Sequence, residues 1–149
     1  MHEYRATTSW RRTSEDFTYD TYNRAHEVTF GGGEVVPWSA APEFKGDAHR
    51  VNPEEAFVAA LSTCHLLTFL ALAARKGWIV DTYTDAAFGV MERNSQGKYW
   101  VSRVTLRPKV TFSGEHQPST DEISALHHTA HDNCFVANSV RTEVTVDER

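Results

Sequence analysis

The sequence lacks the cysteines that would stabilise the fold by disulfides and the apolar leader that would direct the protein out of the cell. Its two cysteines are too few for a disulfide scaffold, and the polar start at residues 1–5 has no apolar leader segment. No Gly/Pro/Ser linker, internal repeat or low-complexity tract divides the 149 residues. These absences predict one domain, residues 1–149, in a reducing, cytoplasmic setting where a cysteine pair is more often chemical than structural.

Concentrated charge and phosphate-binding motifs are also missing. The formal net charge is −5, and the charged residues are scattered, so neither nucleic acid nor an anionic membrane is an expected partner. The three glycines at 31–33 precede an expected strand instead of a helix, so they do not form a nucleotide cradle. We therefore expect no cofactor.

One long apolar run is present. Residues 56–74 read AFVAALSTCHLLTFLALAA, which is about the length that crosses a bilayer. Polar residues interrupt this run, and the mean hydropathy of the chain is negative. Because an all-apolar helix also occupies the centre of many soluble folds, we expect a core helix here and no membrane span.

Local signals divide the chain into strands and two helices. An N-cap Asn52, a first-turn Pro53 and the acidic Glu54 and Glu55 predict a helix that runs to about Lys76 and stops at Gly77. At about 35 Å, this helix is too long for one small sheet to cover on every side. The strands expected before it are Arg5–Arg12, Phe17–Tyr22, His26–Phe30 and Glu34–Trp38.

After the long helix, the pattern predicts two strands, Thr82–Arg93 and Lys98–Phe112, joined by a turn at residues 94–97. A capping-box spacing at Ser119 then starts a second helix, whose core stripe includes Cys134, and a final strand covers Ser139–Asp147. This order indicates an α+β fold, with an antiparallel sheet, a long buried central helix and a second helix.

Cys64 is the most informative polar residue, because it lies in the middle of the apolar helix with His65 beside it. A free cysteine often behaves as a small hydrophobic residue. Two observations favour chemistry instead: a second cysteine lies on the core stripe of another helix, and polar neighbours of Cys64 must find partners in the interior.

These residues resemble the OsmC/Ohr family, the osmotically induced and organic-hydroperoxide-resistance proteins. The resemblance rests on Asn52-Pro53-Glu54-Glu55, on a Cys ten residues after Glu54, and on a far Cys in the segment AHDNCFVANS at 130–139. It extends from Tyr4 to Val146. The resemblance implies an intertwined homodimer and a thiol-dependent peroxidase that reduces organic hydroperoxides.

Residue by residue, the resemblance places the peroxide-attacking thiol at Cys64, the resolving thiol at Cys134 and the helix-opening acid at Glu54. The family also uses an arginine near the first thiol, for which Arg24 is the best candidate and Arg50 a weaker substitute. His65 replaces an apolar residue of better-known members, which suggests a less characterised branch. We expect His26 and His65 to contribute to substrate binding, and His26 to lie near Arg24.

The expected chemistry follows from the thiol. A cysteine on an apolar helix is mostly protonated at neutral pH, so a guanidinium is needed to stabilise the thiolate and the charge that develops on the peroxide oxygen. Glu54 would orient that guanidinium as a bidentate partner. Cys64 would become a sulfenic acid, Cys134 would condense with it to a disulfide, and a dithiol reductant, for which a lipoyl-type compound is one candidate, would reset the pair.

A distance along the helix predicts a second chain. Ten helical residues separate Glu54 from Cys64, a rise of about 15 Å, so on a straight helix the two cannot serve one small site. Either the helix is sharply bent, or Glu54 completes the site of a second copy of the chain. We favour the second, with two long helices packed about a two-fold axis.

Two other functions remain open. His127 and His131, spaced i, i+4 on the helix that also carries Cys134, and His65 are ligand types that zinc accepts, although we expect the first two on an exposed helix face and predict no metal site. Alternatively, the apolar interior binds a lipid-like ligand and both thiols are passive. In a peroxidase, an apolar funnel for bulky peroxides would be formed by the aromatic residues Trp10, Tyr22, Trp38 and Trp100, although aromatic residues on strands more often belong to a core.

Overall fold

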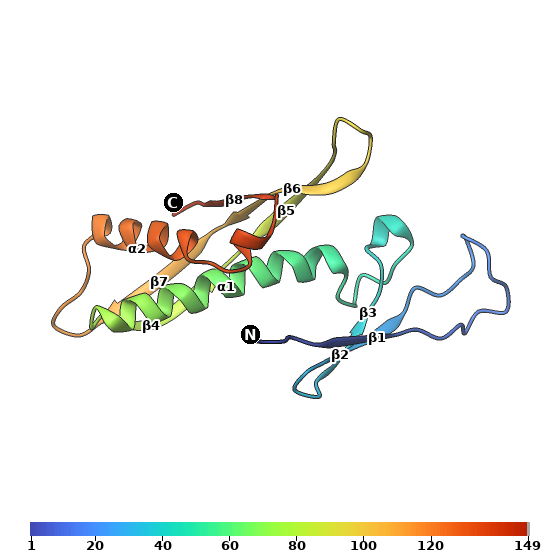
Figure 1. Ribbon diagram of the computed structural model, residues 1–149, viewed down its shortest axis with the longest axis horizontal. Coiled ribbons are helices and arrows are strands. Elements are labelled where there is room, and N and C mark those ends of the chain that lie inside the picture. The colour runs from blue at the N-terminus through green and yellow to red at the C-terminus, as the bar shows by residue number, and fades with distance from the viewer. Residues whose placement is uncertain (149) are drawn as a thin grey trace. The chain divides into compact units, whose positions relative to one another are not determined.

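The computed structural model describes residues 1–148 as two compact units, Met1–Ala56 and a second unit from Phe57 onward (Figure 1). The first unit contains a three-stranded sheet and a short 3₁₀ helix at Pro42–Phe44. The second contains most of α1 (Pro53–Arg75), all of α2 (Thr120–Asp132) and two further sheets. That the whole chain acts as one domain stays a prediction.

The sheet of the first unit is antiparallel, in the order β1 (Ala6–Ser9), β2 (His26–Phe30) and β3 (Val35–Trp38). The glycine-rich turn between β2 and β3 is confirmed, and Gly33 has a φ of +89° there. The strand expected at Phe17–Tyr22 is wrong. That segment forms turns, because the Thr21 hydroxyl accepts from the Thr18 N–H and offers the backbone a local partner.

Helix α1 begins and ends where the sequence predicts. The Asn52 side chain accepts a hydrogen bond from the Glu55 N–H at 2.8 Å, and Gly77 adopts a φ of +74° after the last turn. Its core-facing residues recur every four positions, as Leu61, His65, Phe69 and Ala73. By length and composition alone α1 could cross a membrane, but the core helix of a soluble protein passes the same test.

The two long strands expected after α1 are wrong, because each is divided in two. The four strands are β4 (Ile79–Asp85), β5 (Phe88–Arg93), β6 (Tyr99–Leu106) and β7 (Pro108–Ser113). The β5–β6 hairpin with its turn at 94–97 is confirmed, whereas β4 pairs with β7 in a separate sheet. Between the sheets, the Asp85 carboxylate accepts from the Arg107 N–H at 2.6 Å, which gives this backbone group a partner outside the strand ladders.

The C-terminal elements are shorter than expected. The capping box of α2 is confirmed, but α2 ends at Asp132, so Cys134 lies just beyond the helix. The last strand, β8 (Glu143–Val146), follows a 3₁₀ helix at Ala137–Ser139 and pairs in parallel with β6. The predicted α+β class is confirmed, and β6–β8 is the parallel exception among otherwise antiparallel pairs within residues 1–148.

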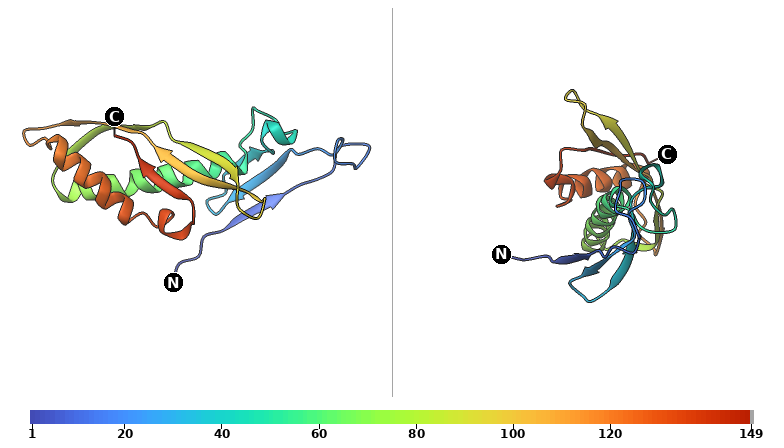
Figure 2. Two further views of the ribbon diagram at one scale, coloured as in Figure 1. Left: turned by 90° about the horizontal axis from the view of Figure 1, so that it is seen from above. Right: turned by 90° about the vertical axis from the view of Figure 1, so that its right-hand side faces the viewer.

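Helices α1 and α2 lie side by side in the second unit (Figures 1 and 2). Their buried residues Phe69, Ala73, Leu126 and Ala130 form one core with side chains of β4 and β7. A second core joins Leu61 of α1 to Val104 and Leu106 of β6, with β8 packed against it. These two cores fix the middle of α1, where Cys64 lies, and the end of α2, just before Cys134.

Candidate active site

The structure brings together two cysteines that are far apart in the sequence. The Cys64 Sγ, in the middle of α1, accepts a hydrogen bond from the Val136 N–H at 3.5 Å. The Cys134 Sγ accepts one from the Ala137 N–H at 3.4 Å. Burial and a hydrogen bond with Cys64 raise the pKa of Cys134 to about 11. Both thiols are free, so one site contains two reduced sulfurs in contact.

The two thiols differ in exposure. Cys134 is 1% exposed, whereas Cys64 is half-buried. Because its pKa is raised, Cys134 stays protonated near neutral pH. The Cys64 sulfur accepts a hydrogen bond from the Val136 N–H, so a backbone donor is directed at this atom. The Cys64 sulfur is therefore the one of the two that a dissolved reactant can reach.

His65 lies in the core, where its Nε2 is 3.0 Å from the Nδ1 of His127. The two rings are nearly parallel, with 7° between their planes, and the His127 ring also stacks on Phe69. The expectation that His127 lies on an exposed helix face is wrong, because it is 2% exposed. Its neighbour Leu126 and Ala130 one turn later are also buried, so the buried face of α2 is wide enough to include it.

Burial keeps this pair uncharged. Desolvation, and then the neighbouring His127 and His131, lower the pKa of His65 to about 4, and desolvation lowers the pKa of His127 as well. Among residues 1–148, no group of three His, Cys, Asp or Glu side chains is arranged to hold a metal ion. Of the predicted i, i+4 pair, His127 belongs to a hydrogen-bonded core, whereas the Nδ1 of His131 has no hydrogen-bond partner within residues 1–148.

Arg24 and His26 line a cavity of about 690 Å³ in the first unit, together with Trp10, Phe17 and Tyr22. The Arg24 guanidinium donates to the carbonyls of Tyr22 and Tyr19, at 2.6 and 2.5 Å, and lies over the Tyr22 ring. The Arg24 Nε is buried and finds no hydrogen-bond partner among the described residues. The cavity therefore combines apolar walls with one cationic group.

Other predicted residues lie elsewhere in the first unit. The Arg50 Nε pairs with the Asp47 carboxylate at 3.4 Å. Glu54 is half-buried in the first turn of α1 and forms no ion pair within residues 1–148. Of the four aromatics expected to form a funnel, Trp10 and Tyr22 share the cavity, and its lining in the described part of the chain includes neither Trp38 nor Trp100.

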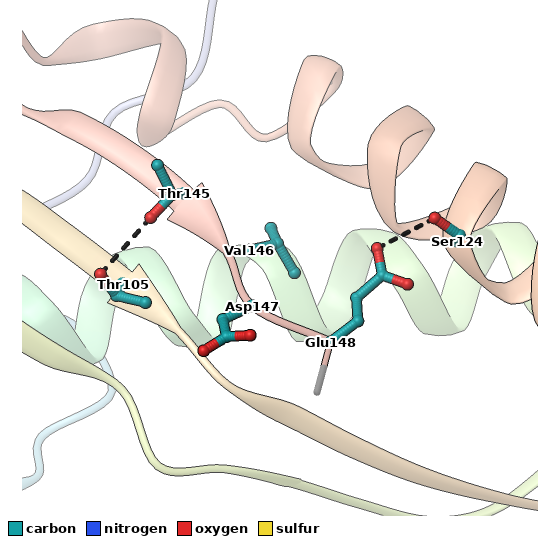
Figure 3. Close-up of a pocket in the computed structure, with 6 residues that line it drawn as sticks. All are labelled: Thr105, Ser124, Thr145, Val146, Asp147 and Glu148. Carbon is teal, nitrogen blue, oxygen red and sulfur yellow. Dashed lines mark hydrogen bonds between the residues drawn. The ribbon is translucent and has the colours of Figure 1, made fainter.

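A second hollow, of about 560 Å³, lies in the second unit between α2 and the ends of β6 and β8 (Figure 3). Its lining is polar and acidic and holds no thiol or imidazole group; it consists of Thr105, Ser124, Thr145, Val146, Asp147 and Glu148. The Ser124 hydroxyl donates to the Glu148 carboxylate at 3.2 Å. Cysteine chemistry is thus confined to the junction of α1 with the segment after α2.

Comparison with known proteins agrees with this geometry. The OsmC-like protein family matches residues 46–149 of the chain. The chain belongs to the OsmC-like family. An OsmC-like protein of unknown function from Vibrio cholerae has a structure with a TM-score of 0.95 and 47% identity, covering 99% of both chains. The recognition made from the two cysteine motifs is therefore confirmed.

More distant relatives share the fold of this OsmC-like chain. The organic hydroperoxide resistance protein OhrB of Bacillus subtilis is 17% identical, with a TM-score of 0.70 over 99% of this chain and 98% of OhrB. The protein YmaD of Bacillus subtilis is 23% identical over 126 residues, which is 82% of each chain. At these identities, the likeness to OhrB establishes the fold.

Sequence reasoning missed the partner of His65 in this OsmC-like chain. The available signal was that His127 directly follows the core residue Leu126 and precedes Ala130 by three, which places it near the buried stripe. It also missed Phe17, which was assigned to a strand and instead lines the Arg24 cavity. Local residue spacing does not predict the His65–His127 bond or the place of Phe17 in the cavity, because each depends on how other segments of the chain pack.

Proposed function

We propose that this protein is a thiol-dependent peroxidase that reduces organic hydroperoxides to alcohols. The observation that carries the proposal is the contact between two free cysteines, one on α1 and one after α2. Membership of the OsmC-like family, and a fold shared with organic hydroperoxide resistance proteins, support the same reading. The reaction is placed in the cytoplasm, where reduced thiols persist.

The proposed cycle has three steps. The Cys64 thiolate attacks the peroxide, the O–O bond breaks, and the protonated alkoxide leaves as an alcohol while the sulfur becomes a sulfenic acid. The Cys134 thiol then displaces the sulfenic oxygen, which leaves as water, and a disulfide forms. A dithiol reductant, with a lipoyl-type compound as one candidate, reduces that disulfide and returns both thiols.

Exposure and protonation support this division of roles. Cys64 is the more exposed sulfur, and it accepts a backbone N–H. Cys134 is 1% exposed, and burial raises its pKa, so it reacts poorly with peroxide. Its retained proton is useful in the second step, because the sulfenic oxygen must be protonated to leave as water.

Single-turnover oxidation tests the proposal. One equivalent of tert-butyl hydroperoxide is added to the reduced protein, and thiols, sulfenic acid and disulfide are quantified by alkylation and mass spectrometry. We expect the wild type to lose both thiols and form an intramolecular disulfide. Cys134→Ser should stop at a sulfenic acid on Cys64, and Cys64→Ser should lose turnover by a factor of about 10³ or more.

The two serine variants serve as controls for each other, since each removes one sulfur at the same site. Retention of both thiols after peroxide addition to the folded wild type would contradict the proposal. Oxidation of Cys134 at an undiminished rate in Cys64→Ser would reverse the assigned roles.

The functional unit is proposed to be a homodimer. On α1, the face away from the core stays exposed, and Leu67 on it is 61% exposed. Ala60, Thr63 and Ala71 continue this exposed face. A second copy packed on this face would bury it and supply Glu54 to the partner's site. Sedimentation should give a dimer, and Leu67→Lys should give a monomer with reduced turnover; a fully active monomeric wild type would contradict this.

The cavity beside Arg24 favours a second candidate function, binding of an apolar ligand that carries a hydrogen-bond acceptor. Its walls are mainly apolar and include Trp10, Phe17 and Tyr22, and the buried Arg24 Nε has no hydrogen-bond partner in the described part of the chain. Under this alternative the thiols are passive. Titration with a fluorescent fatty acid separates the two: passive thiols predict equal affinity in wild type and Cys64→Ser, together with no hydroperoxide turnover in either.

A further inference from the structure

The hydrogen bond between His65 and His127 joins the two helices on which the cysteine pair depends. His65 follows Cys64 on α1, and His127 lies on α2, which ends two residues before Cys134. The 3.0 Å bond is fully enclosed, since His65 is 0% and His127 is 2% exposed. The remaining contacts between the buried faces of these helices are apolar. The pair is thus a polar link between the segments that position the two sulfurs.

The partners of the two rings determine where protons can reside. The His65 Nδ1 is buried and has no hydrogen-bond partner within residues 1–148. In the neutral pair, His65 Nε2–H donates to His127 Nδ1, and the unpartnered His65 Nδ1 then carries no proton. The reverse tautomer would leave an N–H buried without an acceptor, which costs free energy.

Adding a proton to the histidine pair is unfavourable in either position. If His65 is the cation, both of its nitrogens carry N–H groups. If His127 is the cation, its Nδ1–H must donate to His65 Nε2, so His65 shifts its own proton to Nδ1. Either hydrogen-bonded arrangement puts an N–H on the buried, unpartnered His65 Nδ1. Acid therefore opposes this bond, and a second proton abolishes it.

Groups on the surrounding elements do not remove this cost. His131, on α2, opposes a charge on His65. Asp85 of β4 and Glu148, which follows β8, favour a charge on His127, but desolvation outweighs both. The Tyr83 hydroxyl on β4 is buried without a partner, and burial and then Asp85 raise the pKa of Tyr83. No acid side chain is hydrogen-bonded to either imidazole among the described residues.

We propose that His65 and His127 are a positioning pair for disulfide formation, which holds the segment bearing Cys134 against Cys64 when both imidazoles are neutral and releases it in acid. The inference deepens the proposed peroxidase function, because it assigns a role in the second step. The residues act through the two sulfurs and touch no substrate. Acid would then uncouple the steps, so that the Cys64 sulfenic acid accumulates before Cys134 reaches it.

Two substitutions distinguish the effect of the His65–His127 hydrogen bond from the effect of protonating the imidazoles. His65→Gln keeps an amide at the Nε2 position, which donates to neutral His127 and, after rotation, accepts from protonated His127, so its bond survives acid. His127→Leu removes the bond at every pH. His128→Asn is the matched control, because it removes an exposed histidine from the adjacent position of α2. A doubly substituted protein, His65→Gln with His127→Asn, re-forms the bond without any imidazole.

Each protein is oxidised once in two ways, at about pH 7.5 and at about pH 3.5, which lies below the lowered pKa of His65. One arm uses tert-butyl hydroperoxide and compares the rate of disulfide formation with the rate of sulfenic acid formation in the same protein, trapped with dimedone. The other arm uses diamide, which oxidises a neighbouring dithiol without a peroxidase step. Circular dichroism at both pH values selects the folded variants.

In both arms, acid should slow disulfide formation by wild type and His128→Asn at least about threefold more than by His65→Gln or the double variant. At about pH 7.5, His127→Leu should form its disulfide about tenfold more slowly than wild type, because a small misplacement of reacting groups is costly. Equal acid dependence in all folded variants, or an unchanged rate in His127→Leu, would overturn the inference. If hydroperoxide produces no sulfenic acid but diamide gives the expected pattern, the positioning role stands and the peroxidase proposal fails.

Discussion

The two compact units differ in how they hold their chemically important residues. The second unit contains two apolar cores, built mainly by α1, α2 and β6, and in it Cys134 is buried and Cys64 half-buried. The first unit buries few hydrophobic side chains, Val28 and Ala41 among them, and leaves Phe17 and Tyr19 largely exposed. It holds its arginine by hydrogen bonds to backbone carbonyls and by aromatic contact.

The difference separates two requirements of thiol chemistry. A pair of sulfurs must meet at bonding distance, which a close-packed core provides because its side chains have little room to shift. The guanidinium predicted to serve the thiolate is held differently, by carbonyls two and five residues away in a loop, so its position depends on few distant contacts. The first unit should therefore tolerate little change in its few tight contacts, and the second should respond mainly to charge in its core.

The largest effect is expected at Gly46 in the first unit. A Cβ built there overlaps the backbone carbonyl of Ala40, which cannot move without opening the loop. Gly46→Ala should lower the free energy of unfolding by about 4 kcal/mol or more, measured by urea unfolding followed by tryptophan fluorescence. Gly32→Ala is the control, because its Cβ meets no atom within 4 Å. Equal stability of the two variants would show that the close approach of Gly46 to the Ala40 carbonyl does not limit the side chain at this position.

The second unit should lose stability in acid through His65. Its pKa is about 4 in the fold and 6.5 in the unfolded chain, so the unfolded state binds more protons between these values. Stability is therefore complete above about pH 6.5 and falls as pH decreases towards 4, by at most about 3 kcal/mol. Urea unfolding of wild type and His65→Gln across this range measures the effect. Parallel curves for the two proteins would mean that His65 is charged in the fold.

Turnover should depend on the arginine of the first unit. Arg24→Gln should lower kcat/KM for an organic hydroperoxide by about 10²-fold, because it removes the cation proposed to stabilise the thiolate and the developing oxyanion. Arg50→Gln is the matched comparison, since Arg50 already pairs with Asp47. A large loss in Arg50→Gln with none in Arg24→Gln would exchange the two assignments.

The smallest expected effect is at the start of α1. Asn52→Ala removes the side-chain acceptor of the Glu55 N–H and should cost about 1 kcal/mol of unfolding free energy, whereas Asn52→Ser should retain most of it. Thermal unfolding measures both. A loss as large as that of Gly46→Ala would mean that Asn52, which is 5% exposed, contributes more than a helix cap.

Much of the fold was predictable where the signals are local. The caps of α1 at Asn52 and of α2 at Ser119, the Gly77 stop and the β5–β6 turn all depend on residues within one turn of each other. The predicted strand limits were wrong where the pairing partners are distant in the sequence. Residues 82–93 and 98–112 contain continuous β-forming patterns, and their division between two sheets depends on contacts such as Asp85 with Arg107.

The same limit applies to the site. Cys64, Cys134 and the family were predictable because short motifs surround each cysteine, and the family is confirmed. The roles of Cys64, Cys134, Arg24, Glu54 and His26 stay predictions. For His65, which is 0% exposed, the positioning role proposed above would replace the expected substrate contact. His127 was misplaced on an exposed face because α2 alone does not reveal how wide its buried face is.

The amino-acid sequence by itself determined the limits of α1, the start of α2, the β2–β3 and β5–β6 turns, the α+β class and the family, since these follow from backbone propensities and motifs that act over a few residues. Only the tertiary structure decided that the two sulfurs meet, that Cys134 is the buried thiol with the raised pKa, and that His65 bonds to His127. The physical reason is that burial and pairing are set by segments more than sixty residues apart, whose contact depends on the packing of the entire core.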